Sequence, residues 1–106
     1  MNILESKKTL NFDLNDALLK KYYPSKCYKK GWTDIKKFLV QNGFNHRQYS
    51  GYVSKKTILM ADVIHLITTM SLNLKWLQYC VKEFDVTIVG DEYSLKRYIS
   101  KENSFN

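Results

Sequence analysis

The chain has 106 residues, is 44% apolar and 14% aromatic, and carries a formal net charge of +7. This length supports one domain with a modest core, and no apolar run approaches the roughly 20 residues of a membrane-spanning helix. Cys27 and Cys80 lack metal-ligand spacing, and residues 1–8 lack the apolar centre of a signal peptide. We therefore expect a cytoplasmic protein with reduced thiols and no membrane partner.

The first predicted element is a strand over residues 9–14, TLNFDL, preceded by an N-terminal extension over residues 1–8. Its apolar and polar residues alternate with the period of a strand that has one buried face. Asp13 ends the polar face, where a carboxylate is costly to bury without a partner. Either Asp13 caps the following turn in solvent, or it is held there to bind a divalent cation such as Mg²⁺. Asp16, in the predicted turn, is a weaker metal candidate.

An amphipathic helix is predicted over residues 25–42, after a turn that contains Pro24, and Gly43 supplies a left-handed stop. Its apolar stripe consists of Tyr28, Trp32, Ile35 and Leu39. The charge excess gathers here, because seven lysines and one acid, Asp34, lie between residues 20 and 37. Such a block suits a polyanion, most simply nucleic acid, with Lys29 and Lys30 as phosphate contacts. A solvated lysine face explains the same pattern equally well.

Residues 44–54, FNHRQYSGYVS, predict a second strand that is long enough to bend or to form a hairpin, with a kink at Gly51. One face would carry Phe44, His46, Gln48, Ser50 and Tyr52. The amide and hydroxyls of this face suit hydrogen bonds to a phosphate or ribose, although a half-exposed strand face is the simpler interpretation. Ser50 lacks the surroundings of a hydrolase nucleophile. His46 has the pKa range of a general base, but an exposed strand histidine is the simpler interpretation.

Several tyrosines lie near cationic residues in the sequence. The tyrosines are Tyr22, Tyr23, Tyr49 and Tyr52, and the cations are Lys20, Lys21 and Arg47. Together they are suited to stack unpaired bases and hold the backbone of RNA. Taken singly, each tyrosine is explained as well by packing.

The remaining elements complete a β-α-β-α-β-α order. They are a buried helix over residues 58–71, a helical turn over 74–81, a strand over 83–90, a helix over 91–100 and a flexible tail over 101–106. His65, within the first of these helices, is expected to be structural. This order predicts an α+β, ferredoxin-like sandwich over residues 9–100, with a three- to four-stranded, mainly antiparallel sheet. Its open edges and uncovered face favour a homodimer.

With these residues in place, the chain resembles the virulence-associated protein D (VapD) family of toxin–antitoxin modules from about Leu10 to Ile99. The resemblance lies in NFDL (11–14), NGFNHRQYSGYVS (42–54), Tyr23 before Pro24, WL (76–77) and CVKEFDV (80–86). It implies a ferredoxin-like homodimer, related in fold to the nuclease subunit of CRISPR adaptation, that cleaves single-stranded RNA. Asp13 would then be the catalytic aspartate, with Gln48, Ser50 and Tyr52 on the adjoining strand. One departure is Tyr49, which replaces the glycine usual after the glutamine.

Three functions remain open from the sequence. The first is an endoribonuclease toxin in which Asp13 acts with or without Mg²⁺, Ser50 and Gln48 position phosphate, and Tyr52, Arg47, Lys29 and Lys30 bind RNA. The second is an RNA-binding protein without catalysis. The third is a protein-interaction module that engages an antitoxin or a CRISPR component.

Overall fold

The fold is built from a four-stranded sheet and two pairs of helices, one pair between β1 and β2 and the other between β3 and β4. The computed structural model describes residues 6–47 and 51–89. In chain order these residues form β1 (Lys7–Leu14), α1 (Asp16–Tyr22), α2 (Lys30–Gln41), β2 (Phe44–His46), β3 (Gly51–Ser54), α3 (Met60–Asn73), α4 (Leu77–Cys80) and β4 (Val81–Val89). The sheet order is β2-β3-β1-β4, and all neighbouring strands are antiparallel. This is the ferredoxin-like α+β arrangement that the sequence predicted.

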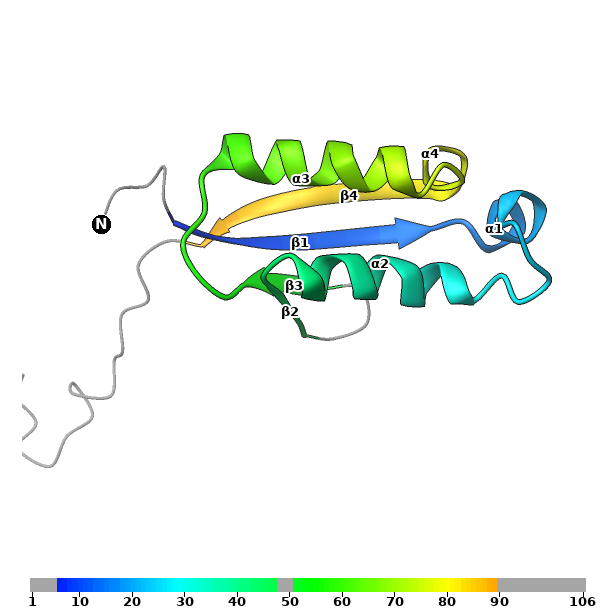
Figure 1. Cartoon of the computed structure of the whole chain (residues 1–106), viewed down its shortest axis with the longest axis horizontal. Helices are drawn as coiled ribbons and strands as arrows, with labels where there is room; N and C mark the ends of the chain where they lie inside the picture. Colours follow the sequence, from blue (N-terminus) through cyan, green and yellow to red (C-terminus); the bar gives the residue numbers. More distant parts are fainter. Residues whose placement is uncertain (1–5, 48–50, 90–106) are drawn as a thin grey trace, which may run out of the picture.

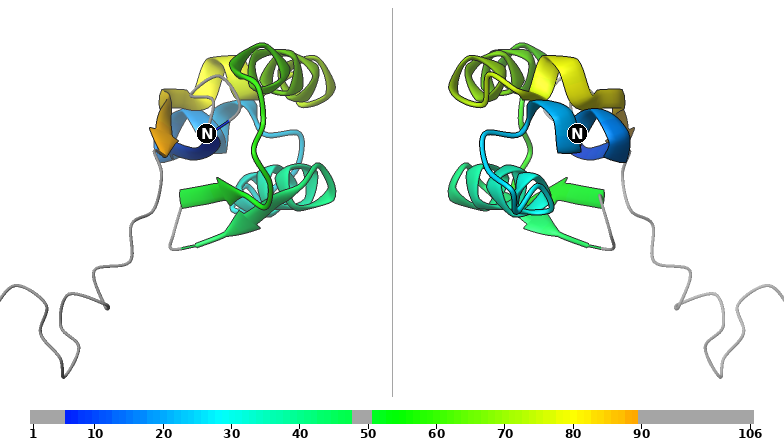
Figure 2. Two further views of the ribbon diagram at one scale, coloured as in Figure 1. Left: turned by 90° about the vertical axis from the view of Figure 1, so that its left-hand side faces the viewer. Right: turned by 90° about the vertical axis from the view of Figure 1, so that its right-hand side faces the viewer.

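The two long helices, α2 and α3, lie on one face of the sheet (Figures 1 and 2). No other described element covers the opposite face, which we call the open face. Along β1 the side chains alternate between buried and more exposed positions, with Leu10, Phe12 and Leu14 on the helix-covered side. The period-2 pattern of the sequence therefore separates a packed face from one available to solvent.

Phe12 is the centre of the packed face. Its ring stacks on Phe84 of β4, Trp32 of α2 and Tyr52 of β3, with ring centroids 5.3, 5.4 and 5.9 Å apart. Since aromatic rings bury large apolar areas, this cluster joins three strands to one helix.

A buried lysine extends the helix-covered side of β1. Lys8 is 1% exposed, and its ammonium group donates hydrogen bonds to the carbonyl of Ser6 at 2.8 Å and to the carbonyl of Ile58. The Lys8 backbone N–H donates to the Ser54 hydroxyl at 3.0 Å. These bonds satisfy the charge inside the fold and tie the start of β1 to the segment before α3.

Several sequence predictions are confirmed. The strand over 9–14 is present, although it begins two residues earlier. A helix over 58–71 is present as α3, but it is not the more buried helix, since it buries only Val63 and Met70 and leaves Ile64 60% exposed. Gly43 follows the end of α2 with φ of 91°, as predicted. Of the two forms considered for residues 44–54, the hairpin is observed, since Phe44 pairs with Ser54 and His46 with Tyr52.

Two local predictions are wrong. The segment after β1 is the helix α1 rather than a turn, because the Asn15 side chain caps it by accepting from the Leu18 N–H at 3.0 Å and Leu19 is buried. The basic helix begins at Lys30 rather than at residue 25. The predicted helix over 91–100 and tail over 101–106 lie outside the described residues.

Candidate nucleic-acid interface

Four elements meet at one end of the molecule, where β1 ends. They are the last residues of β1, α1, the start of α2, and α4, and we call this region the α1 end (Figures 1 and 2). The Asn15 N–H donates to the Cys80 carbonyl at 2.8 Å, which ties the exit of β1 to α4. Gly31 allows α2 to approach closely, since a Cβ there would lie 2.9 Å from the Leu19 side chain and 3.0 Å from Trp76.

Asp13 lies on the open face at this end. Its side chain is 54% exposed, and a carboxylate oxygen lies 3.7 Å from the Lys82 ammonium. The N-cap of α1 is Asn15 and not Asp13, so the capping role considered from the sequence falls to Asn15. An exposed ion pair contributes at most about 1 kcal/mol, which leaves the Asp13 carboxylate little structural purpose.

Two further acids lie beside Asp13 on β4. Glu83 is the cross-strand partner of Asp13, and Asp85 is the partner of Asn11. Side chains that face each other across antiparallel strands have Cβ atoms about 4.5–5.5 Å apart, and like charges there repel. Neither acid was predicted as a site residue from the sequence, although both flank Phe84 in β4 and therefore belong to the face opposite its ring.

The Asp13–Glu83 pair offers oxygen ligands but not a complete metal site. Among residues 6–47 and 51–89, no group of three histidine, cysteine or acidic side chains could hold a metal ion. Mg²⁺ is commonly bound by one or two carboxylates, with water and substrate phosphate completing its shell. The pair therefore fits a weak Mg²⁺ site that a nucleic-acid phosphate would complete. Asp16 is exposed in the first turn of α1, where its charge complements the helix dipole.

The predicted lysine contacts are exposed at the α1 end. Lys29 is the N-cap residue of α2, and Lys30 is its first residue, with no acid in the first turn. Cations at a helix N-terminus oppose the helix dipole, so this arrangement is electrostatically unfavourable without an anion nearby. The lysines of α1 lie over aromatic rings, Lys20 5.3 Å from the centre of Tyr28 and Lys21 5.2 Å from that of Tyr22.

Of the residues that the sequence placed on the substrate-binding strand, the structure describes Tyr52 but not Gln48 or Ser50. Tyr52 was expected on a half-exposed face but is 2% exposed, because its face is the helix-covered one. Its ring stacks on Phe12 and lies 4.7 Å from that of His46, so it offers RNA no surface. Burial raises its pKa. Gln48, Tyr49 and Ser50 lie outside the described residues.

The hairpin brings one cation toward Asp13. Arg47 is exposed, and its backbone N–H donates to the Gly51 carbonyl at 2.7 Å. Gly51 pairs with Asn11, two residues before Asp13, so this end of the hairpin lies beside the middle of β1. His46 is exposed as expected, whereas His65, expected to be structural, is exposed on α3.

Tyr23 joins α1 to α2 rather than standing free to stack. Its hydroxyl donates to an Asp34 carboxylate oxygen at 2.6 Å, and its ring meets Trp76 edge-on at 5.2 Å. Burial, followed by the Asp34 hydrogen bond and charge, raises the pKa of Tyr23 to about 12. Its role here is packing, the alternative that the sequence left open.

Comparisons with known proteins show a distant similarity to an endoribonuclease. No family model matches the sequence. Endoribonuclease VapD 2 of Riemerella anatipestifer is 24% identical over 89 residues, which cover 84% of this chain and 95% of that protein. None of the described helices is long and apolar enough to cross a membrane.

Proposed function

We propose that this chain is an endoribonuclease that cleaves single-stranded RNA, with Asp13 at the reacting centre. The observation that carries the proposal is the Asp13 carboxylate itself, exposed on the open face beside Glu83 and free of any capping role. The similarity to an endoribonuclease over most of both chains supports the same activity.

The residues around Asp13 suit two parts of the reaction. The Asp13 carboxylate accepts a proton from the attacking water or RNA 2′-hydroxyl as that oxygen bonds to the scissile phosphorus. The bond from phosphorus to the leaving nucleotide oxygen breaks, and that oxygen takes a proton from solvent water. A magnesium ion held by Asp13 and Glu83 would supply positive charge against the scissile phosphate. Lys29, Lys30 and Arg47 hold the RNA backbone, while Gln48 and Ser50 position phosphate on the basis of the family resemblance.

A homodimer is the proposed active form. The open face and the edge strand β4 are uncovered in the described chain, and such surfaces favour pairing with a second copy. Pairing across the open face about a two-fold axis beside Asp13 would bring both copies of Asp13 together and double the carboxylates available for a cation. A molecular mass by sedimentation equal to one chain at activity-assay concentrations would contradict the dimer.

The biological role that we propose is that of a cytoplasmic toxin neutralised by an antitoxin protein, and it rests on the resemblance alone. Induced expression in a bacterial host should arrest growth with the wild-type chain and not with Asp13→Asn at equal protein level. Normal growth with both chains would contradict the toxin role.

Binding of RNA without cleavage is the second candidate, because the exposed lysines at the α1 end require no reaction to hold RNA. To separate the two, wild type, Asp13→Asn and the control Asp16→Asn are incubated with end-labelled single-stranded RNA in Mg²⁺ or EDTA. We expect wild type to cleave, Asp13→Asn to cleave about 100-fold more slowly or worse, and Asp16→Asn to match wild type. Binding without cleavage by wild type would instead support the second candidate.

The attacking group is tested with the same RNA carrying a single 2′-deoxy residue at the mapped cleavage position. Persistent cleavage there assigns the attack to water, whereas its loss assigns the attack to the 2′-hydroxyl.

A further inference from the structure

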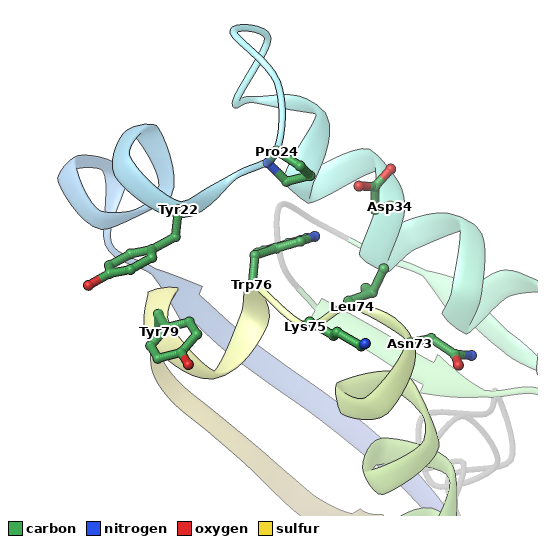
Figure 3. Close-up of a pocket in the computed structure, with 8 residues that line it drawn as sticks. All are labelled: Tyr22, Pro24, Asp34, Asn73, Leu74, Lys75, Trp76 and Tyr79. Atoms are coloured by element: carbon green, nitrogen blue, oxygen red, sulfur yellow. The ribbon is translucent and has the colours of Figure 1, made fainter.

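A pocket separate from the open face lies among the helices of the α1 end. It has a volume of about 510 Å³ and lies between α1, α2 and the connection from α3 to α4. Its lining residues are Tyr22, Pro24, Asp34, Asn73, Leu74, Lys75, Trp76 and Tyr79 (Figure 3). This volume is within the roughly 300–1,000 Å³ of small-molecule sites, so the pocket is large enough for one nucleotide unit.

Aromatic rings form one side of this pocket. Tyr22 and Tyr79 stack on each other with ring centroids 4.7 Å apart and an interplanar angle of 19°. Both remain well exposed, Tyr22 at 39% and Tyr79 at 52%, while Trp76 beside them is 7% exposed. An exposed stack of this kind contributes little to the core and offers a flat apolar platform on which a base can stack.

Polar groups lie on the other side of Trp76 (Figure 3). Asp34 is oriented by the Tyr23 hydroxyl, which donates to one of its oxygens at 2.6 Å. A carboxylate has about four lone-pair sites, so Asp34 retains capacity to accept N–H groups. The Asp34 carboxylate would repel phosphate but can accept hydrogen bonds from the N–H groups of a base. Lys75, on the same side of Trp76 as Asp34, and Lys21, beside Tyr22, carry the positive charge that phosphates require.

We propose that this pocket binds one unpaired nucleobase of single-stranded RNA. The base stacks on the outer face of Tyr79, which Tyr22 backs, Asp34 accepts an N–H of the bound nucleotide, and Lys21 and Lys75 hold its phosphates. The substrate class rests on the proposed function, but base binding does not require that the chain cleave RNA. The pocket anchors the strand at the α1 end, where the phosphate contacts of α2 also lie.

The test compares one short single-stranded RNA with a series of versions of it. Each version lacks the base at one position, and that position moves along the strand from one version to the next. Affinities are measured in EDTA, so that cleavage does not contribute. Wild type should lose about 5- to 150-fold in affinity at one abasic position. Tyr79→Ala should bind the intact RNA correspondingly more weakly and lose the discrimination, while the control Ile64→Ala, 60% exposed on α3, should behave as wild type.

A second variant is needed because Tyr79→Ala also removes the ring that packs on Tyr22. Asp34→Asn retains an acceptor for the Tyr23 hydroxyl and should preserve the fold, yet alter which bases bind most tightly, because an amide presents donors as well as an acceptor. Discrimination unchanged in both variants would overturn the pocket while leaving Asp13-dependent cleavage intact. Base discrimination in a chain that cleaves nothing would support the pocket and overturn the proposed nuclease. Failure to bind RNA, or binding of a protein partner blocked by Tyr79→Ala, would overturn the base-binding proposal.

Discussion

The two faces of the sheet differ in what their side chains do. On β1, Lys8, Leu10, Phe12 and Leu14 turn toward the helices and are at most 5% exposed. Their neighbours Lys7, Asn11 and Asp13 turn the other way and are exposed. One strand therefore supplies both the core and the candidate reacting group, which means that adjacent substitutions should affect different properties.

The largest expected effect is on the packed face. Phe12→Ala should lower the free energy of unfolding by about 3–5 kcal/mol, because it removes the ring shared by Phe84, Trp32 and Tyr52 and leaves a cavity. Urea denaturation followed by circular dichroism measures the change. Asn11→Ala, one residue away on the open face, should stay within about 0.5 kcal/mol of wild type. Equal losses in both variants would abolish the distinction between the faces.

Lys8 on the packed face and Lys7 on the open face allow the two faces to be compared with the same residue type. Lys8→Met should cost about 1–3 kcal/mol, because the carbonyls of Ser6 and Ile58 lose their donor inside the fold. Lys7→Met removes an exposed ammonium and should change stability by about 0.5 kcal/mol or less. Urea denaturation midpoints, converted with one m-value, give the change in unfolding free energy of both variants. If Lys8→Met were as stable as Lys7→Met, the buried hydrogen bonds of Lys8 would contribute nothing to stability.

Tyr23 extends the comparison to the α1 end. Tyr23→Phe should cost about 1 kcal/mol at pH 8, since it removes the hydrogen bond to Asp34. The pKa is raised from 10.0 to about 12 in the folded chain, so the unfolded chain loses its proton first. The stabilisation is therefore complete below pH 10 and is lost as the pH rises toward 12.

The corresponding measurement is the difference in unfolding free energy between wild type and Tyr23→Phe at pH 8 and at pH 11. We expect the difference to shrink at the higher pH. Tyr22→Phe, outside the Asp34 bond, is the matched control and should show no such trend. A difference that is constant with pH would contradict the role given to this bond.

The smallest effect on stability is expected at the exposed lysines. The double variant Lys29→Ala/Lys30→Ala should fold as wild type but reduce the salt slope of single-stranded RNA binding by about 1.4, at about 0.7 for each phosphate contact. Lys55→Ala/Lys56→Ala removes the same charge between β3 and α3, at the opposite end (Figure 1). An equal change of slope in both double variants would show that the lysines act through net charge and not through position.

The sequence predicted what local periodicity determines. The alternation around Phe12 identified the packed face, and the stripe through Ile35 and Leu39 identified the basic helix, because both patterns depend only on spacing along one element. The glycine at residue 43 likewise marked a helix end through its own backbone freedom.

Features that depend on distant segments were not predictable in this way. Glu83 joins Asp13 only through the pairing of β1 with β4, which lie about 70 residues apart in the chain. Tyr52 was placed on an exposed face because the strand pattern does not say which face the helices cover. The short helix α1 is different, because its signals are local: Asn15 caps it, and its Ala, Leu and Lys residues favour a helix. It was missed because Asn15, Asp16 and Pro24 were interpreted as turn residues.

The most direct test of the account measures cleavage and unfolding free energy on the same preparations of Asp13→Asn and Phe12→Leu. We expect Asp13→Asn to lose about 100-fold or more in single-turnover cleavage rate while its stability stays within about 1 kcal/mol of wild type. Phe12→Leu should lose stability by about 1–2 kcal/mol and, while folded, cleave at close to the wild-type rate. Wild-type cleavage by folded Asp13→Asn would contradict the assignment of Asp13 as the reacting group.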